Sequence, residues 1–285
     1  MTICSPKAIF YAILAALLYA INAPFSKLLL TEIPSTMMAG LLYLGAGIGM
    51  SILEKFNKNK KELPLTKKEV PYTIAMVVLD IAAPIFLMIG LTKCSAANAS
   101  LLNNFEIVAT SLIALFIFRE TISKRLWFAI TLVTISSILL SFEDMSSLQF
   151  SWGSILVLFA CICWGFENNC TRMLSSKNPA QIVIIKGFGS GIGALVLSFV
   201  IGERFFQLKY ILFALLLGFI AYGLSIYFYI YAQRYLGAAK TSTYYAISPF
   251  IGAGLSLIIF NEMPSRIFII ALVIMAFGTY FASTE

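Results

Sequence analysis

The sequence has no histidine and few charged residues. Of its 285 residues, 12% are Asp, Glu, Lys or Arg and 60% are hydrophobic, whereas soluble domains contain about 25% charged residues. This composition and the mean hydropathy of +0.92 exclude a water-soluble enzyme, a nucleic-acid-binding domain, a disordered regulator and a secreted disulfide scaffold. Without histidine, proton handling falls to carboxylates, lysines, tyrosines or water. The composition therefore predicts an all-α integral membrane protein.

Metal ligands are also scarce. The chain has five cysteines, an odd number, and Cys161 and Cys163 would point to opposite sides of a helix, which argues against a zinc site. Buried free cysteines behave as small hydrophobic residues. We expect no metal and no cofactor. Much of the net charge of +7 lies in one short loop between apolar segments, so it does not indicate nucleic-acid binding.

A helix needs about 20 mostly apolar residues to cross a bilayer, and the sequence offers ten such segments joined by short connections. No stretch between them is long enough for a soluble domain, so the helices themselves must carry the function. The ten predicted spans are Ala8–Leu30, Pro34–Leu53, Tyr72–Leu91, Ser95–Phe118, Leu126–Phe142, Trp152–Leu174, Ala180–Ile201, Tyr210–Gln233, Ala238–Phe260 and Ile267–Ser283.

The ten spans form an internal repeat. The glycine-rich residues 45–49 of span two match residues 189–193 of span seven (189 − 45 = 144), and residues 19–27 of span one match residues 164–172 of span six at nearly the same spacing. Span four matches span nine in the same way. We therefore predict two related five-helix halves, residues 1–145 and 146–285. The glycines at these positions are expected to let helix backbones approach closely.

Basic residues predict the orientation of the chain. The Glu54–Pro71 loop carries six lysines, and Lys and Arg are enriched in cytoplasmic loops. The loop is therefore placed in the cytoplasm, together with both termini. Because each half has an odd number of spans, the second half enters the membrane from the opposite side. Such inverted repeats are typical of secondary transporters that work by alternating access.

Several short motifs give the sequence a family resemblance. They are Trp164-Gly165 with Arg172, Ala96-Ala97 through Glu106, Ser248-Pro249, Arg119-Glu120 and Asn261-Glu262. With ten spans in two halves, the whole chain resembles the EamA-type transporters of the drug/metabolite transporter superfamily. The resemblance implies a carrier of small organic metabolites, and favours export. It also implies that spans one, three, four, six, eight and nine line a cavity while spans five and ten lie at the periphery.

Three acids and one lysine lie deep inside predicted spans, away from the span ends, where each costs about 2.5–3.5 kcal/mol to insert. Glu106 is either a ligand for a substrate cation or a coupling proton, or a packing carboxyl bonded to Asn103 one turn earlier. Asp80 either takes part in proton coupling or pairs with Lys186, which we interpret as structural. Glu167 is the third buried acid. Three acids and one base leave a negative surplus within the membrane, which favours cationic or zwitterionic solutes.

Tyrosines in spans eight and nine add a further element, because aromatic faces bind organic ammonium groups through cation–π contacts. The predicted substrate site, including the intramembrane acids, comprises Asn22, Asn103, Glu106, Glu167, Tyr227, Tyr244, Tyr245 and Ser248. The candidates for proton coupling are Asp80 and Glu106.

These observations predict a secondary transporter, and not an enzyme, in the plasma or inner membrane. Its expected substrates are small nitrogen compounds such as amino acids or amines, with a proton as the candidate coupling ion. The alternative is a membrane-embedded enzyme acting on lipid or prenyl substrates. Such enzymes usually carry paired aspartates for magnesium or a histidine site, and here the sole adjacent acid pair, Glu143-Asp144, lies outside the spans. A non-transporting partner or receptor subunit is a third hypothesis. Solute flux in proteoliposomes separates the first from the others.

Overall fold

The structure is a computed structural model of the chain. It describes residues 6–56, 63–117, 119, 122–144, 149–174, 177–236, 241 and 244–283. The predicted boundary between residues 145 and 146 therefore lies outside the described residues, as do Glu120 and the Ala238-Ala239 pair.

The described elements of the chain up to Ser141 are all helices. They are α1 (Pro6–Ala20), α2 (Asn22–Leu29), α3 (Ser35–Phe56), the 3-10 turn η1 (Lys67–Glu69), α4 (Val70–Lys93), α5 (Ala96–Leu102), α6 (Phe105–Phe116) and α7 (Lys124–Ser141).

A short antiparallel hairpin, β1 (Phe142–Asp144) and β2 (Gln149–Phe150), joins the halves and is a small exception to the expected all-α fold. The second half then consists of α8 (Trp152–Leu174), α9 (Pro179–Val200), α10 (Leu208–Gly218), the π-helical segment η2 (Phe219–Leu224), α11 (Ser225–Leu236), α13 (Ser248–Ile259) and α14 (Arg266–Ser283).

Within the described residues, eight helical segments are long and apolar enough to cross a membrane. They correspond to the first eight predicted spans, and the chain is thus a multi-pass membrane protein. Two shorter apolar helices, Ser248–Phe260 and Arg266–Ala282, occupy the places of spans nine and ten. The count of ten crossings stays a prediction.

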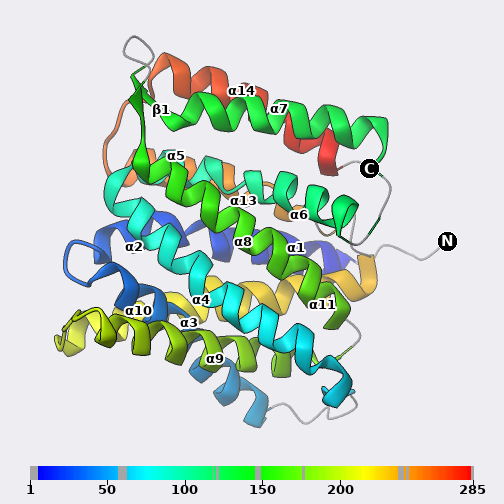
Figure 1. Cartoon of the computed structure of the whole chain (residues 1–285), viewed down its shortest axis with the longest axis vertical. Coiled ribbons are helices and arrows are strands. Elements are labelled where there is room, and N and C mark those ends of the chain that lie inside the picture. Colours follow the sequence, from blue (N-terminus) through cyan, green and yellow to red (C-terminus); the bar gives the residue numbers. More distant parts are fainter. Residues whose placement is uncertain are drawn as a thin grey trace.

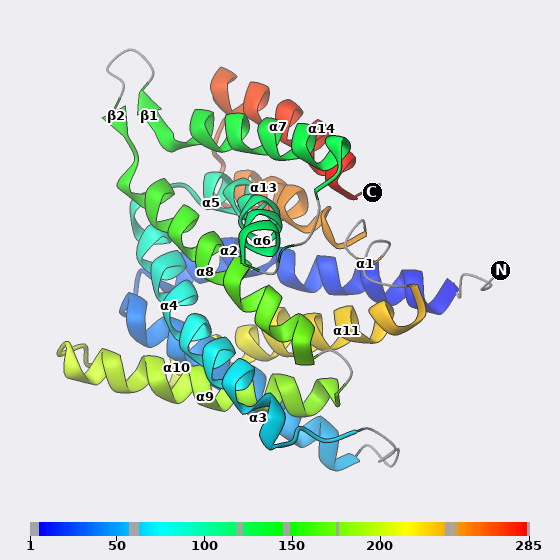
Figure 2. The same ribbon diagram turned by 45° about the vertical axis from the view of Figure 1, so that its right-hand side comes forward.

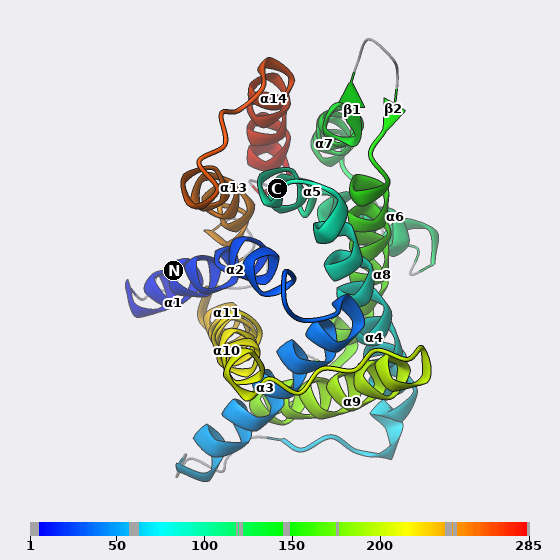
Figure 3. The ribbon, with the colours of Figure 1, turned by 90° about the vertical axis from the view of Figure 1, so that its left-hand side faces the viewer.

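The helices pack in layers (Figures 1 and 3). The helices α7 and α14 lie against each other at one edge of the molecule, and α3 and α9 form a second pair at the opposite edge. Between these pairs lie α4 with α8, α1 with α11, and α5 with α13. The start of α1 and the end of α14 lie on the same side of the bundle (Figure 2).

Glycines set the distance between α3 and α9, as predicted. A Cβ atom on Gly47 would lie 3.0 Å from the backbone of Gly187 and Phe188, and one on Gly191 would lie 2.7 Å from the backbone of Leu44. Side chains larger than hydrogen would therefore force the two helices apart. The predicted role of these glycines in packing is confirmed.

Positions related by the predicted repeat make exchanged contacts. Gly47 corresponds to Gly191 and Leu44 to Phe188, so the contact between Gly47 and Phe188 has its counterpart in that between Gly191 and Leu44. Two non-glycine residues, Arg119 (φ 55°) and Asn261 (φ 51°), have left-handed backbone conformations. They too occupy corresponding positions after the fourth and ninth spans.

Three spans are interrupted near their middles. The break between α1 and α2 falls at Ile21, and that between α5 and α6 at Asn103 and Asn104. Pro24 explains the first break, because its ring cannot donate to Ala20 and clashes with that carbonyl. The Asn pair explains the second, since asparagine side chains compete with helical backbone bonds. A turn at residues 246–247 likewise precedes α13.

Candidate functional site

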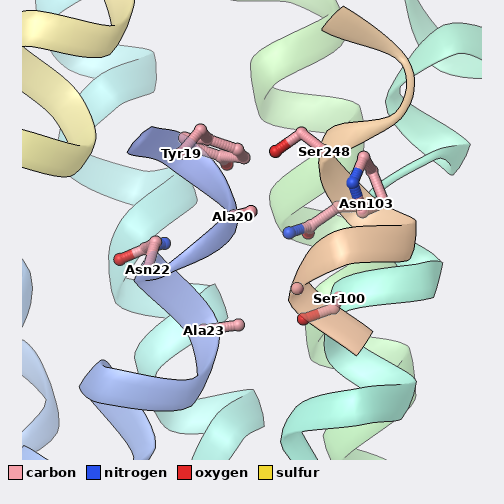
Figure 4. Close-up of a pocket in the computed structure, with 9 residues that line it drawn as sticks. Tyr19, Ala20, Asn22, Ala23, Ser100, Asn103 and Ser248 are labelled. Atoms are coloured by element: carbon pink, nitrogen blue, oxygen red, sulfur yellow. The ribbon is translucent and has the colours of Figure 1, made fainter. Parts of the chain in front are cut away.

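A small pocket lies where the three interrupted spans meet, between α1/α2, the end of α5 and the start of α13. It has room for about one water molecule, whereas most ligand pockets measure roughly 300–1,000 Å³. Figure 4 shows Tyr19, Ala20 and Ala23 facing Ser100, Asn103 and Ser248 across it. The lining residues are Tyr19, Ala20, Asn22, Ala23, Ser100, Asn103, Ser248, Pro249 and Gly252.

Three buried oxygen atoms in this pocket lack a hydrogen-bond partner. They are Oγ of Ser100, Oδ1 of Asn103 and Oγ of Ser248, on residues that are 3%, 8% and 0% exposed. At least about 90% of buried polar groups in proteins are paired, and leaving one unpaired costs about 1–3 kcal/mol. Three such atoms around one cavity form a set of vacant hydrogen-bonding positions for a bound molecule.

The helix breaks supply further polar groups at the same level. α2 begins at Asn22, α5 ends at Leu102 and α13 begins at Ser248, so three helix ends converge on the pocket. In transporters, interrupted helices of this kind form solute and ion sites near the middle of the bilayer.

A buried group of three charged side chains, the charge triad, lies apart from this pocket. Nζ of Lys186 on α9 is 2.9 Å from Oε1 of Glu167 on α8 and 3.2 Å from Oδ2 of Asp80 on α4. The Tyr43 hydroxyl donates to Oδ1 of Asp80 at 2.8 Å, and the Thr171 hydroxyl donates to Glu167. The ion pair considered for Asp80 and Lys186 is thus present, with Glu167 as its second acid.

A chain of contacts connects the charge triad to the pocket. The ring of Tyr43, which donates to Asp80, lies 5.0 Å from the ring of Tyr222. The Tyr222 hydroxyl accepts a hydrogen bond of 3.1 Å from Nδ2 of Asn22, and Asn22 lines the pocket. The Ser26 hydroxyl donates to Oδ1 of Asn22 at 3.0 Å and fixes the orientation of the amide.

Glu106 lies outside the pocket lining. Its Oε1 accepts a hydrogen bond of 2.5 Å from Nδ2 of Asn168 on α8, whose amide also reaches Thr110 at 3.3 Å. The alternative in which Glu106 is a packing carboxyl bonded to Asn103 is therefore wrong. That expectation assumed one continuous helix, whereas the turn between α5 and α6 removes the two residues from a common face.

The predicted tyrosines lie away from the pocket lining. Tyr227 packs against Phe228 and Tyr231, with ring centroids 5.7 and 6.5 Å apart. Tyr245 is closer to the pocket, since its ring lies 5.9 Å from that of Tyr19 and its hydroxyl is 3.4 Å from Oγ of Ser225. Tyr244 is half-buried.

Of the predicted substrate site, the structure places Asn22, Asn103 and Ser248 in one pocket and Glu167 in the charge triad. Sequence reasoning did not select Tyr19, Ser100 and Tyr43. Ser100 had a detectable signal, because it is a polar residue in the small, polar first part of span four. Tyr43 is surrounded by apolar and glycine residues of span two and gave none.

Comparisons with known proteins agree with this architecture. The EamA-like transporter family matches the chain twice, over residues 6–142 and 151–284. An uncharacterized transporter of Methanothermobacter thermautotrophicus is 25% identical over 270 residues, which cover 88% of this chain and 78% of that protein. A crystal structure with 14% sequence identity superimposes with a TM-score of 0.68 and covers 97% of this chain and 95% of its own, which shows a shared fold. The chain belongs to the EamA-like transporter family.

Proposed function

We propose that this protein is a secondary transporter that moves a small organic solute across the cell membrane by alternating access, with the pocket between α1/α2, α5 and α13 as its solute site. The observation that carries the proposal is the set of unpaired oxygens of Ser100, Asn103 and Ser248. A solute that donates hydrogen bonds would satisfy all three, and the buried pocket would exclude competing water.

The positions that the repeat relates to the pocket lie in both halves of the chain and form a closed counterpart of it. By the repeat, Ser248 corresponds to Glu106, Ala23 to Asn168 and Gly252 to Thr110. These three counterparts are joined by the hydrogen bonds of Asn168 to Glu106 and Thr110. The pocket is thus open while its equivalent is closed. This arrangement is expected when inverted halves exchange conformations. We therefore assign residues 1–145 and 146–285 to inverted halves, with ten crossings and both termini cytoplasmic.

The chemistry of the pocket favours a solute with an ammonium group. Asn103 offers its Oδ1 strictly as an acceptor, and the hydroxyls of Ser100 and Ser248 can also accept. Glu106 and the charge triad add a formal surplus of negative charge within the membrane. We propose amines or amino acids as the substrate class, outward movement as the direction and the proton as the coupling ion. The matched family and the name of the relative point to transport and not to catalysis on lipid substrates.

Two serine variants test the site. Ser248→Ala and Ser100→Ala each remove an unpaired buried oxygen, so the variants should melt at or above the temperature of the parent protein while binding the solute more weakly. Ser198→Ala is a matched control, because Oγ of Ser198 is also buried and unpaired but lies outside the pocket lining. It should gain the same stability and keep transport unchanged.

The measurements are a thermal-shift screen of the purified protein against amino acids and amines, followed by flux of the selected compound into proteoliposomes. Binding to the native state raises the melting temperature. If no compound produces a shift or a flux, or if Ser198→Ala loses transport as Ser248→Ala does, the pocket is not the solute site.

A further inference from the structure

We propose that the charge triad of Asp80, Glu167 and Lys186 is the site of the coupling proton, and that Tyr43, Tyr222 and Asn22 link it to the solute pocket. The inference rests on the proposed function and adds to it a second site and a route between the two sites. Within that route, Tyr43 and Tyr222 are positioning residues, because they act on the pocket through Asn22.

The charge balance of the triad calls for a proton. Two carboxylates share one ammonium group, which leaves one formal negative charge on residues that are 0%, 3% and 5% exposed. Burying an uncompensated charge is far more costly than burying a neutral group. Binding of one proton to a carboxylate oxygen leaves a neutral carboxyl beside an Asp–Lys or Glu–Lys pair. No other bond forms or breaks, and the proton returns to water when the site opens.

Other ionisable groups surround the triad. Tyr43 faces it from α3, Tyr222 lies beyond Tyr43 on η2, and Glu106 on α6 is held by Asn168 of α8. Cys170 lies on α8, one turn from Glu167. Lys27 of α2 is occupied at the far end of α4, where it donates to the carbonyls of Leu91 and Cys94. Lys186 is thus the one cation that contacts the two acids among the described residues.

The triad draws on both halves but has no charged counterpart. At the positions that the repeat relates to Asp80, Glu167 and Lys186 stand Gly223, Asn22 and Leu42. When the two halves exchange conformations, the surroundings of the buried charge change. The free energy of that charge therefore differs between the two states. A ligand shifts a conformational equilibrium only by its difference in affinity for the two states. Because the triad is asymmetric, the proton binds to one conformation more tightly than to the other.

The link to the pocket follows from the hydrogen bonds. An ionised Asp80 accepts a charge-assisted bond from Tyr43, and this bond weakens when the carboxylate is protonated. Tyr43 packs against Tyr222, and Tyr222 holds the amide of Asn22 in the pocket wall. A shift of Tyr43 thus changes the position of Asn22 without any direct contact between proton and solute.

The test measures opening of the pocket in the absence of solute. In a full-length protein whose native cysteines are replaced by alanine, Ser248→Cys is labelled with N-ethylmaleimide in proteoliposomes at about pH 6 and about pH 8, which differ about 100-fold in proton concentration. Each rate is divided by that of the same protein unfolded in dodecyl sulfate, which removes the pH dependence of the thiol itself. We expect the normalised rate to change at least about fivefold, the lower end of typical coupling between sites.

Asp80→Asn, Tyr43→Phe and Tyr222→Phe should each abolish this pH dependence, and Tyr210→Phe, which removes a hydroxyl outside the network, should retain it. The two tyrosine variants test the same link independently. If one of them fails to fold, the other still tests the link. A parent protein without pH dependence, or Asp80→Asn with it, would overturn the proton site. Tyrosine variants that behave like the parent would overturn the link. Because no solute is used, these outcomes are distinct from a failure to detect transport.

Discussion

A single methyl group at Gly187 should loosen the contact between α3 and α9. A Cβ atom there would lie 2.3 Å from N and 2.4 Å from Cα of Gly47, and 2.9 Å from the carbonyl oxygen of Tyr43. All three are backbone atoms, which cannot turn aside as a side chain can. Restoring an ordinary contact of about 3.5 Å requires the helices to separate by roughly 1 Å.

The expected cost combines two terms. Overpacking a well-packed interface costs typically about 1–3 kcal/mol, and alanine regains about 0.5–1 kcal/mol over glycine within a helix. Gly187→Ala should therefore lower the free energy of unfolding by about 1–2 kcal/mol. It should also move Tyr43 and so weaken the pH dependence expected above.

Gly254→Ala is the matched control, because nothing lies within 4 Å of a Cβ atom at that position and the residue is in the middle of α13. This variant should melt at or slightly above the temperature of the parent protein. The melting temperatures of both variants are measured by thermal unfolding in detergent, followed by size-exclusion chromatography of the remaining folded protein. Equal melting temperatures for the two variants would refute the assignment of Gly187 to a backbone contact.

Three other predictions concern charge and topology. Lys186→Met removes the cation between two buried acids and should lower the free energy of unfolding by about 3–5 kcal/mol. Lys186→Met combined with Asp80→Asn should melt at a temperature closer to that of the parent protein. Equal losses of stability in the single and double variants would mean that the triad is hydrated. Glu106→Gln keeps an acceptor for Asn168 and should fold normally, with reduced flux in proteoliposomes; full flux would remove a role for its charge. A cysteine introduced by Asn59→Cys should resist membrane-impermeant thiol reagents in intact cells, and ready labelling would reverse the proposed orientation.

The sequence predicted the eight long apolar helices and the glycine packing because both depend on local composition. Continuous apolar runs define where helices cross, and glycines spaced along one helix face have few other uses in a membrane. The pairing of Asp80 with Lys186 was also foreseeable, since buried charges inside a bilayer seek partners. Glu167 as the third member required the packing of α4 against both α8 and α9, which no local pattern encodes.

The pocket was harder to foresee, because its walls depend on breaks in three helices. Pro24 was a visible signal for the first break, but Asn103 and Asn104 read equally well as polar residues on a continuous helix. The unpaired oxygens became evident only from the absence of partners in three dimensions. Tyr43 shows the same limit, since its role depends on the neighbours Asp80 and Tyr222 that come from other helices.

The repeat explains why corresponding residues carry different chemistry. Glycine contacts such as Gly47 with Phe188 and Gly191 with Leu44 occur in both halves, because both halves must pack at the same distance. Ser248 and Glu106 correspond as well, yet Ser248 has an unpaired oxygen in the pocket whereas Glu106 is bound by Asn168. If the halves exchange conformations, the bond to Glu106 must break as the pocket beside Ser248 closes. Glu106 would then be exposed to the solute in the second conformation alone, which is how a residue outside the present pocket can still influence transport.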